Sequence, residues 1–388
     1  MNRKLNVFLS LTLALAFVLA ACAPASTPTE APATEPPATE APTEAPAVAT
    51  EAPAVDPLVA LAEESKGETE GLLVHSIMGE NNWAPVIAAF NAKYPWITVT
   101  ALDLGTTETF EKYYTESAGG ARTADMIITS STDGWQDFIA KGELQVYNPV
   151  NIEGMPDFAT LADGVYAVST DPMIIIYNKQ LVTTPPETME AVAAFASDPA
   201  NAGKITTYDA EKNGTGYGIN WFWAANKGDA GWATLETIGK SNVNMQTSAG
   251  NMVNAVLSGE ASVGYFVSGI SVFPKFPEAE PILGYSYQKD GQVVLVRGMG
   301  ITKAAKSPAS AKLLMEFILS AEGQIAWAEG GLTPYRPDVA DKAKYHLQKV
   351  IDAVGEENII PFFFDPNIAS ADNRAAFLAK WKTAFGRP

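Results

Sequence analysis

The stretch Asp163–Leu181 divides this chain into two sets of alternating strands and helices. It holds two apolar, β-branched runs that are typical of strands, Val165–Ser169 and Met173–Tyr177. Asp171-Pro172 stands between them, and we expect the proline, which lacks a backbone N–H, to interrupt the strand pairing. A chain divided in this way commonly holds a ligand between its halves, so the stretch predicts a crossing between two lobes. A hairpin inside one large sheet is the alternative that this stretch alone leaves open.

Before this stretch, strands and helices alternate in the order βαβαβ. The expected strands are Gly71–Ile77, Trp96–Leu102 and Asp125–Thr129. This order predicts a parallel sheet with right-handed crossovers, and the ligands of such sheets lie beyond the carboxyl ends of the strands. Two of these ends are His75–Glu80 and Thr129–Asp133.

The second half of the chain repeats the alternation. A strand at Gly203–Asp209 leads into the glycine-rich segment Asn213–Gly218, and we expect an aromatic helix to start at Trp221. Because glycine permits a close approach of the backbone, this segment is predicted to form the second lobe's part of a ligand site. The remaining strands are expected at Ala261–Phe266, Ile282–Tyr287 and Gln292–Arg297, and helices at Pro308–Leu319 and Glu322–Ala328.

Composition limits the class of partner. The 388 residues are 47% hydrophobic, which is enough for a sizeable core and indicates two domains. The formal net charge is -18. Nucleic acid requires basic patches for its phosphates, so this charge argues against a nucleic-acid partner.

Residues 1–22 have the features of an export signal. Positive charge at Arg3 and Lys4 precedes the apolar run Val7–Ala21, which is too short to predict a membrane span. The sequence Leu19-Ala20-Ala21-Cys22 resembles a bacterial lipobox, which implies that Cys22 is lipidated and becomes the first residue of the mature chain. An ordinary signal peptide with an incidental cysteine is the alternative. Cys22 is the only cysteine, so no disulfide is possible within the chain.

Residues 23–70 are predicted to form a disordered tether. Ala, Pro, Thr and Glu dominate as far as Val55, with Thr-Glu-Ala-Pro at residues 29–32, 39–42, 43–46 and 50–53. Such a segment has too little apolar bulk to offset the entropy of ordering its chain. A tether of this kind holds a folded domain at a distance from a membrane surface.

Polar and aromatic side chains near the predicted strand ends are candidates for ligand binding. The candidates in the first lobe are Ser76, Glu80, Ser130 and Ser131. Ser and Thr at a helix start cap the helix and leave backbone N–H groups that hold anions, with plain capping as the alternative. The candidates in the second lobe, where aromatic rings can stack on a solute, are Thr215, Tyr217 and Trp221.

Two arginines next to turn residues, Arg297 and Arg336, are candidates for binding an anion. The planar guanidinium fork suits a carboxylate or a phosphate, and a surface ion pair is the alternative for each. Tyr265 and Tyr335 are further candidates for lining a cleft. Core packing is the alternative for both tyrosines.

No catalytic residue and no cofactor is predicted. The sequence has no Gly-x-Ser-x-Gly elbow, no His-Glu-x-x-His motif and only two histidines. Its glycine-rich segment is neither a Walker loop nor a dinucleotide fingerprint. A surface-anchored hydrolase and an adhesive domain on a stalk stay open as alternatives, supported only by export and by the tether.

Several stretches together resemble the solute-binding proteins of bacterial ABC importers, and in particular the group of ferric-iron, 2-aminoethylphosphonate, thiamine and polyamine binders. The resemblance covers essentially all of residues 71–340, and it lies in the order of the motifs more than in any one of them. The stretches are the lipobox, Lys93-Tyr94-Pro95, Ala124-Asp125-Met126-Ile127, Ile176-Tyr177-Asn178-Lys179, Leu257-Ser258-Gly259-Glu260-Ala261 and Ala304–Gln324.

The resemblance implies an α/β fold of the periplasmic-binding-protein type II. Such a fold has two lobes, each with a mostly parallel central sheet and helices on both faces, joined by a two-strand hinge. The first lobe would comprise residues 71–165 and 298–340, the second 175–290 and 341–388, and the hinge 166–174 and 291–297. Ligand contacts to both lobes shift such a protein toward its closed state.

The resemblance also implies a monomeric lipoprotein at the outer face of the cytoplasmic membrane, which delivers a small solute to an ABC permease. Strand ends rich in Ser, Thr and Gly favour an anionic solute or a metal chelate. Ferric binders of this group use an adjacent pair of tyrosines, whereas Phe266 follows Tyr265 here. Ferric iron, with His75 and Tyr265 as ligands, is the alternative solute.

Overall fold

The computed structural model describes residues 56–362 and 365–388. The predicted export signal with Cys22, and the predicted tether as far as Val55, lie outside the described residues. The long path of the sheet consists of β1 (Leu72–Ser76), β2 (Val99–Asp103), β3 (Met126–Thr129), β6 (Val165–Asn178), β7 (Ile205–Tyr208), β8 (Asn244–Gln246), β9 (Val263–Ser268) and β11 (Gln292–Thr302). Short strands extend it: β4 (Leu144–Gln145) and β12 (Ile359–Phe362) pair with β11, and β5 (Thr160–Ala162) and β10 (Leu283–Ser286) pair with β6.

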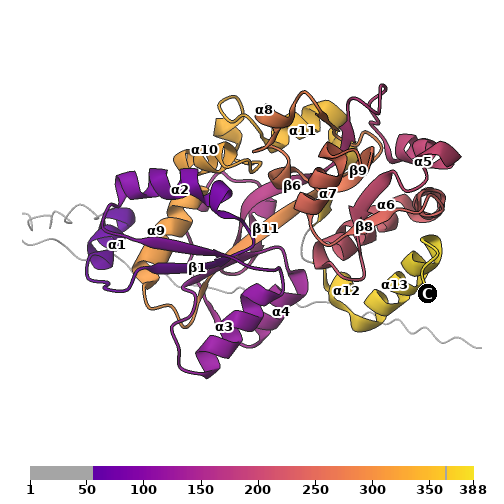
Figure 1. Cartoon of the computed structure of the whole chain (residues 1–388). Coiled ribbons are helices and arrows are strands. Elements are labelled where there is room, and N and C mark those ends of the chain that lie inside the picture. Colours follow the sequence, from indigo (N-terminus) through magenta and orange to yellow (C-terminus); the bar gives the residue numbers. More distant parts are fainter. Residues whose placement is uncertain (1–55, 363–364) are drawn as a thin grey trace, which may run out of the picture. The chain divides into compact units, whose positions relative to one another are not determined.

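These strands form one mixed sheet in the order β2-β1-β3-β11-β6-β9-β7-β8 (Figure 1). Strands β2, β1 and β3 pair in parallel, as do β8, β7 and β9. The parallel pairing of the first group confirms the prediction from the βαβαβ order. Between the two groups run β11 and β6, which pair with each other and with their outer neighbours in the antiparallel sense.

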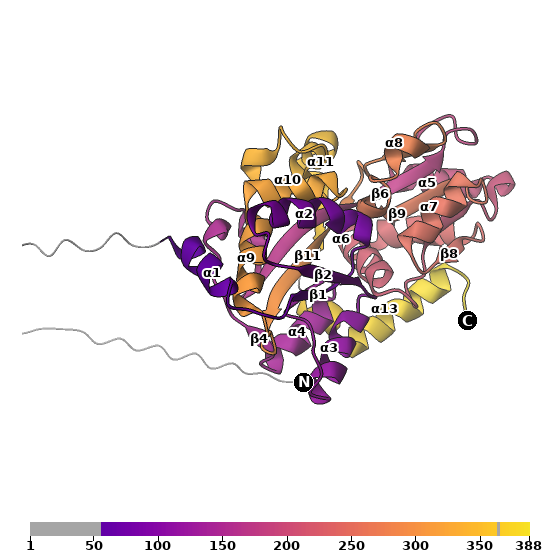
Figure 2. The same ribbon diagram turned by 60° about the vertical axis from the view of Figure 1, so that its left-hand side comes forward.

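Helices cover both halves of this sheet. They are α1 (Pro57–Ser65), α2 (Glu80–Lys93), α3 (Glu108–Ala118), α4 (Thr132–Ala140), α5 (Met189–Ser197), α6 (Gly214–Gly239), α7 (Ala249–Leu257), α8 (Phe276–Ala279), α9 (Pro308–Leu319), α10 (Ala321–Glu329), α11 (Leu347–Val354), α12 (Pro366–Ala369) and α13 (Ala371–Ala384). In Figures 1 and 2, α1, α2 and α9 lie with β1 toward one end of the molecule, and α5 and α7 lie with β8 and β9 toward the other.

The two largest hydrophobic cores lie in different halves. One is built by residues of β1, β3, α2, α9 and α10, including Trp83, Phe90 and Trp327. The other is built by residues of β7, β9, α5, α6, α7 and α13, including Trp223 and Trp381. Strands β6 and β11 contribute side chains to both cores. The two halves are therefore packed separately and share two continuous strands.

The predicted break at Asp171-Pro172 is wrong, because β6 runs without interruption from Val165 to Asn178. Pro172 pairs with Val294 of β11. A proline is tolerated in a strand where one side of it needs no hydrogen bond. Strand β9 pairs with β6 only from Met173 onward, so on that side the missing N–H of Pro172 has no partner strand.

The predicted helix start at Trp221 is also wrong, because α6 begins at Gly214 after the cap residue Asn213. Glycine disfavours a helix, but here it permits close packing. A Cβ atom on Gly216 would lie 2.5 Å from Cβ of Tyr208, and one on Gly218 would lie 2.1 Å from the ring of Phe362. The glycines thus let the first turns of α6 lie directly on β7 and β12.

Residues 56–70, which we expected in the tether, are ordered from α1 onward. Trp96 Nε1 donates a hydrogen bond of 2.9 Å to Ser65 Oγ. The Glu68 carboxylate accepts hydrogen bonds from the backbone N of Ala309 (2.7 Å) and Ser310 (3.0 Å). Because these N–H groups belong to the first turn of α9, Glu68 caps that helix from a distant part of the chain.

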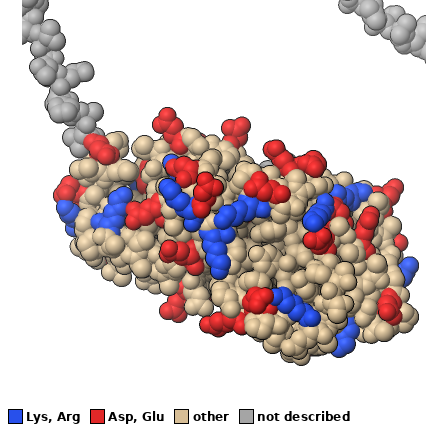
Figure 3. Space-filling view, turned by 90° about the horizontal axis from the view of Figure 1, so that it is seen from above, with Lys and Arg blue, Asp and Glu red and all other residues tan. Residues whose placement is uncertain are grey.

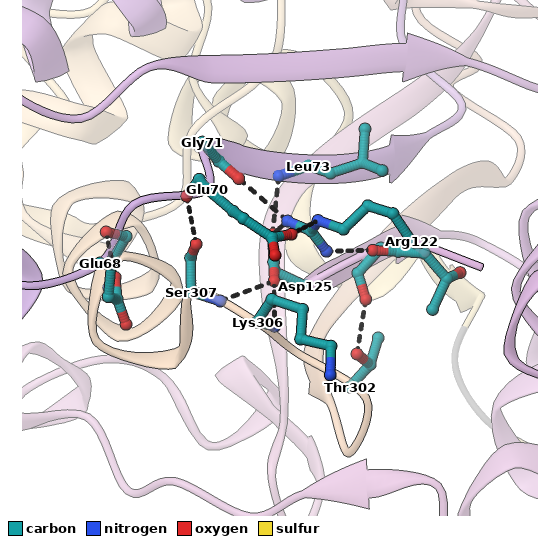
Figure 4. Close-up of polar contacts among 12 residues, drawn as sticks. Glu68, Glu70, Gly71, Leu73, Arg122, Asp125, Thr302, Lys306 and Ser307 are labelled. Carbon is teal, nitrogen blue, oxygen red and sulfur yellow. Dashed lines mark hydrogen bonds and ion pairs between the residues drawn. The ribbon is translucent and has the colours of Figure 1, made fainter. Parts of the chain in front are cut away.

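Buried Asp125 ties this same region together (Figure 4). Its side chain is 0% exposed, and Oδ1 accepts hydrogen bonds from the backbone N of Lys306 (2.7 Å) and Ser307 (3.0 Å). Oδ2 accepts a hydrogen bond from the backbone N of Leu73 and an ion-paired one from Arg122. One carboxylate therefore joins β1, the start of β3 and the start of α9.

The charged surface shows no single-sign region on the face seen in Figure 3, where Asp and Glu are interspersed with Lys and Arg of the described part of the chain. Within residues 56–362 and 365–388, no helix combines the length and the apolar character needed to cross a membrane.

Replacing Asp125 should destabilise the fold strongly. In Asp125→Ala, three backbone N–H groups lose their acceptor and Arg122 loses a buried counter-ion, so we expect the free energy of unfolding to fall by about 3 kcal/mol. Urea denaturation followed by circular dichroism measures this change. The control is Glu63→Ala, which removes only the exposed ion pair with Lys66 and should cost less than about 1 kcal/mol. Equal losses in the two variants would contradict the role given to Asp125.

Candidate functional site

A cleft of about 660 Å³ lies beyond the carboxyl ends of both parallel strand groups. Its lining includes residues that directly follow β1, β2 and β3, and residues that end or directly follow β7, β8 and β9. Among them are Ile77, Leu104, Ser130, Tyr208, Thr247 and Ser268. Ligands of open α/β sheets bind at this edge, so the cleft is the leading candidate for a ligand site.

Arg297 lies in this cleft and is held by a buried ion pair. Its Nη2 donates to Asp171 Oδ2 at 2.6 Å, and the two side chains are 5% and 1% exposed. Nε and Nη1 of Arg297 have no hydrogen-bond partner among the residues described. A buried N–H group without a partner is costly, so these two donors are suited to an acceptor on a ligand.

Asp171 is fixed in turn by the end of β9. Ser268 Oγ donates a hydrogen bond to Asp171 Oδ2, and the backbone N of Ile270 donates one of 3.1 Å to Oδ1. Phe266 has a φ of 55° where β9 changes register against β6, which redirects the strand just before Ser268. Burial, with a smaller effect of the Asp171 charge, raises the pKa of nearby Tyr208, so its phenol stays protonated.

Three helix N-termini also reach the cleft. Asn213 and Thr215 belong to the start of α6, and Ser248 and Gly250 to the start of α7. Helix α2 begins after Gly79, whose position provides no side-chain cap. Helix N-termini carry partial positive charge and free N–H groups, which add to the attraction that Arg297 exerts on an anion.

Carboxylates line the same cleft on its first-half side. Glu80 and Asp103 lie there, and Lys275 lies on the second-half side. Glu80 and Asp103 can accept hydrogen bonds from hydroxyl or ammonium groups, whereas Arg297 can donate to oxygen atoms. The cleft therefore offers both hydrogen-bond acceptors and a charged donor to a ligand.

A second, smaller cavity of about 290 Å³ adjoins the cleft, because Thr106 and Ser130 line both. It lies between the start of α4, the start of α6 and the C-terminal helices α12 and α13. Arg374 of α13 lies over the ring of Tyr217 at 4.4 Å from its centroid. Burial raises the pKa of Tyr217 to about 12, and its hydroxyl donates to the backbone oxygen of Ile368 at 3.1 Å.

The structure brings six of the predicted site residues to these two cavities. Glu80, Thr215 and Arg297 line the cleft, and Ser131 and Tyr217 line the smaller cavity. Ser130 lines both, and its hydroxyl has no hydrogen-bond partner in the described part of the chain. Ser131 Oγ accepts a hydrogen bond of 3.2 Å from the backbone N of Gly134, so it also caps α4.

The other predicted residues line neither cavity. Ser76 Oγ accepts hydrogen bonds from Trp83 Nε1 and from the backbone of Met78, both at 3.0 Å. Trp221 packs against Tyr217 and Phe377. These contacts are structural.

Two further candidates face the backbone near the crossing strands. The hydroxyl of Tyr335 donates to the backbone oxygen of Ala167 at 2.6 Å. Arg336 pairs with Asp338 at 2.8 Å and donates to the backbone oxygen of Leu319 at 3.0 Å. Arg336 therefore has the surface ion pair that was the alternative to anion binding.

The two residues named for a metal also lie away from both cavities. Burial lowers the pKa of His75, whose Nδ1 is 3.1 Å from the backbone oxygen of Thr109. Tyr265 is fully buried and packs against Phe266. Within the described ranges, no group of three or more His, Cys, Asp or Glu is arranged to hold a metal ion.

Sequence reasoning missed Asp171, Ser268 and Arg374 as parts of the site. Asp171 is separated from Arg297 by 126 positions, and Ser268 from Asp171 by 97. Nothing local to these residues indicates their proximity. For Asp171 a signal did exist, since an aspartate inside a long apolar stretch needs a buried partner.

Comparison with known proteins identifies a family and several similar structures. The family model of the bacterial extracellular solute-binding proteins matches residues 86–350. The substrate-binding protein of an ABC transporter from Agrobacterium tumefaciens is similar in structure, with 23% identity, a TM-score of 0.73, and coverage of 84% of this chain and 96% of that one. No curated protein matches this chain.

Two other similar structures hold a bound solute. The periplasmic binding protein AfuA from Actinobacillus pleuropneumoniae, with fructose-6-phosphate bound, has 20% identity, a TM-score of 0.65 and coverage of 81% and 98%. Iron-bound HitA from Pseudomonas aeruginosa has 18% identity, a TM-score of 0.62 and coverage of 81% and 99%. At these identities the likeness shows the fold, and it confirms the predicted α/β fold of periplasmic binding proteins.

The ion pair at the base of the cleft generates a stability prediction. Asp171→Ala leaves the guanidinium of Arg297 buried without a counter-ion, so the free energy of unfolding should fall by about 3–5 kcal/mol. The double variant Asp171→Leu with Arg297→Met removes both charges and should recover most of that loss. Chemical denaturation of the three proteins measures both effects.

Asp338→Ala serves as the control, because its ion pair with Arg336 has a carboxylate that is 58% exposed. This variant should lose less than about 1 kcal/mol. If Asp171→Ala loses no more stability than Asp338→Ala, the buried pair does not have the importance assigned to it.

Proposed function

Because this chain belongs to the bacterial extracellular solute-binding proteins, we propose that its cleft captures one small solute for delivery to an ABC permease. The observation that carries the proposal is Arg297, which lines a cleft of about 660 Å³ and whose buried guanidinium has two donors without a partner among the described residues. A cavity of this size suits a small polar molecule.

We propose that the solute has an anionic oxygen-bearing group, such as a carboxylate or a phosphoryl group. Arg297 supplies N–H donors in a planar arrangement that fits such groups. The starts of α6 and α7 add backbone donors to the same cleft. A phosphate ester bound to the similar fold of AfuA supports this class.

Iron has less support than an anionic solute. The phenol of Tyr265 and the imidazole of His75 are both buried outside the cleft, and burial favours the neutral form of each. A ferric ion requires several anionic oxygen ligands. The cleft that holds the carboxylates Glu80 and Asp103 also holds a cation, Arg297, whose charge would repel the metal.

The two halves are proposed to act as lobes that close on the solute. The first lobe would comprise residues 71–165 and 298–340, and the second 175–290 and 341–388. Strands β6 and β11 are the connections suited to bending, because they alone among the described strands contribute to both large cores. Contacts of one solute with both lobes would shift the population toward closure.

The protein is further proposed to be a monomer anchored by lipid at Cys22 to the outer face of the cytoplasmic membrane. The lipobox-like sequence before Cys22 supports this placement. A tether between the anchor and Asp56 would let the folded part reach a permease.

A solute screen on the purified protein tests the proposed function. Native mass spectrometry identifies what co-purifies, and thermal unfolding then ranks organic acids, phosphate esters, phosphonates, thiamine, polyamines and ferric citrate. A true solute at 100 times its Kd should raise the free energy of unfolding by about 2.7 kcal/mol. Arg297→Gln should weaken its binding about 100-fold, since two charge-assisted hydrogen bonds are lost.

Arg336→Gln is the matched control, because it removes a guanidinium outside the cleft, and it should change the Kd less than about threefold. Absence of any stabilising small solute would contradict the proposed function. If Arg297→Gln and Arg336→Gln change the Kd equally, Arg297 does not have the binding role proposed for it.

The lipid anchor has its own test. In Cys22→Ser, the thiol that would carry the lipid is absent, so the protein should move from the membrane fraction to the soluble exported fraction. Cell fractionation and the mass of the N-terminal peptide measure this change. Ala25→Ser, which leaves the thiol in place, should stay with the membrane. A Cys22→Ser protein that still carries lipid would contradict the anchor.

A further inference from the structure

The smaller cavity beside the cleft has unsatisfied polar groups of its own. Ser130 is 7% exposed, lines both cavities, and its Oγ has no hydrogen-bond partner in the described structure. A buried hydroxyl without a partner carries a free-energy cost. Ser130 thus stands where the two cavities join, within reach of a molecule that occupies both.

The cations of this cavity lack close partners, whereas its anions have them. The guanidinium of Arg374 makes no hydrogen bond or ion pair to any described residue and lies over the face of Tyr217. Lys212 Nζ is 4.0 Å from its nearest carboxylate oxygen, on Asp209, which already pairs with Arg387 at 2.9 Å. The positive charge here is therefore available to a ligand.

The two acidic residues of the cavity are engaged elsewhere. Glu211 pairs with Lys382 at 2.9 Å and lies 3.6 Å from Arg387. Asp133 Oδ1 accepts hydrogen bonds from Ser131 Oγ (2.7 Å) and from the backbone N of Gly134 (3.0 Å), so its charge faces the start of its own helix, α4. The groups of the cavity that are left without a close partner are therefore the cations Arg374 and Lys212, beside the starts of α4 and α6.

We propose that this smaller cavity is a second anion subsite, and that the solute is an elongated molecule with two acidic groups. One group would bind Arg297 in the cleft, the other would bind Arg374, and Ser130 would donate to the segment between them. This inference rests on the proposed function and narrows it to doubly acidic solutes, such as dicarboxylates or phosphorylated acids. Residues of both halves take part, because Ser130 precedes α4 and Arg374 lies in α13.

A structural role of Arg374 is the competing explanation. The guanidinium lies flat on Tyr217, and α12 contacts α4 beside the cavity (Figure 1). A cation over an aromatic ring stabilises packing by itself. The two explanations differ in one respect, because only a binding role distinguishes solutes by their number of acidic groups.

The test compares pairs of solutes that differ by one acidic group. Isothermal titration calorimetry on the full folded protein would use glycerol 3-phosphate against 3-phosphoglycerate, and butyrate against succinate. In at least one pair, the wild-type protein should bind the doubly acidic solute at least about 10-fold more tightly than the singly acidic one. Arg374→Gln should abolish this preference, while Arg297→Gln should weaken both members.

Two further variants separate binding from packing. Arg374→Lys keeps the charge and should keep most of the preference. Lys380→Gln removes a cation from the same helix, α13, where it lies over Trp232 at 4.3 Å and away from the cavity, and it should leave the preference unchanged. Circular dichroism confirms that each variant is folded.

The outcomes distinguish failure of the second subsite from failure of the proposed function. If Arg374→Gln keeps the wild-type preference, or if the wild-type protein shows none, the second subsite is refuted. If the co-purified solute has one acidic group, the second subsite also fails while the proposed function stands. If it has no acidic group, the proposed anionic class of solute fails as well. If no small solute binds at all, both fail together.

Discussion

The candidate site depends on a charged pair that the fold buries at the point where its two halves meet. Arg297 of β11 and Asp171 of β6 face each other across the crossing strands. Removing a charge from water costs several kcal/mol unless a counter-charge and hydrogen bonds accompany it. Asp171 provides the counter-charge, and Ser268 and Ile270 fix Asp171. The guanidinium is consequently held in one place, with two of its nitrogens directed to no protein partner among the described residues.

The connectivity of the sheet explains why this pair stands next to so many other polar groups. Three parallel strands on each side of the crossing end at the same cleft, and each is followed by a turn or a helix start. Side chains and N–H groups at strand ends need not fill a core, so they are free to meet a ligand. This arrangement of strands thus creates the cleft and lines it with hydrogen-bond donors and acceptors. It also places the lining on two separately packed bodies.

Much of the fold could be predicted from the sequence because hydrophobic periodicity and β-branched runs mark the strands directly. Helix α9 has the predicted limits, Pro308 and Leu319. The errors occurred where tertiary contacts outweigh local preference. Pro172 stays within β6 because β9 does not pair with β6 at this position. Gly216 and Gly218 stay within α6 because they pack closely against Tyr208 of β7 and Phe362 of β12. For the site, strand ends could be identified from sequence, but Ser268 and Arg374 could not, since the residues they meet lie far away in the chain. Asp171 gave only the signal of an aspartate inside an apolar stretch, which does not name Arg297 as its partner.

The attachment of α1 has a mechanical consequence. The chain enters the folded part at Asp56, and Ser65 and Glu68 fasten this entry to Trp96 and to the start of α9. If the proposed lipid anchor at Cys22 holds the chain, a pull transmitted to Asp56 would be borne by the body that contains β1 and α9. The opposite body would carry no such load, so under the proposed anchor and closure its movement would be the less restrained of the two.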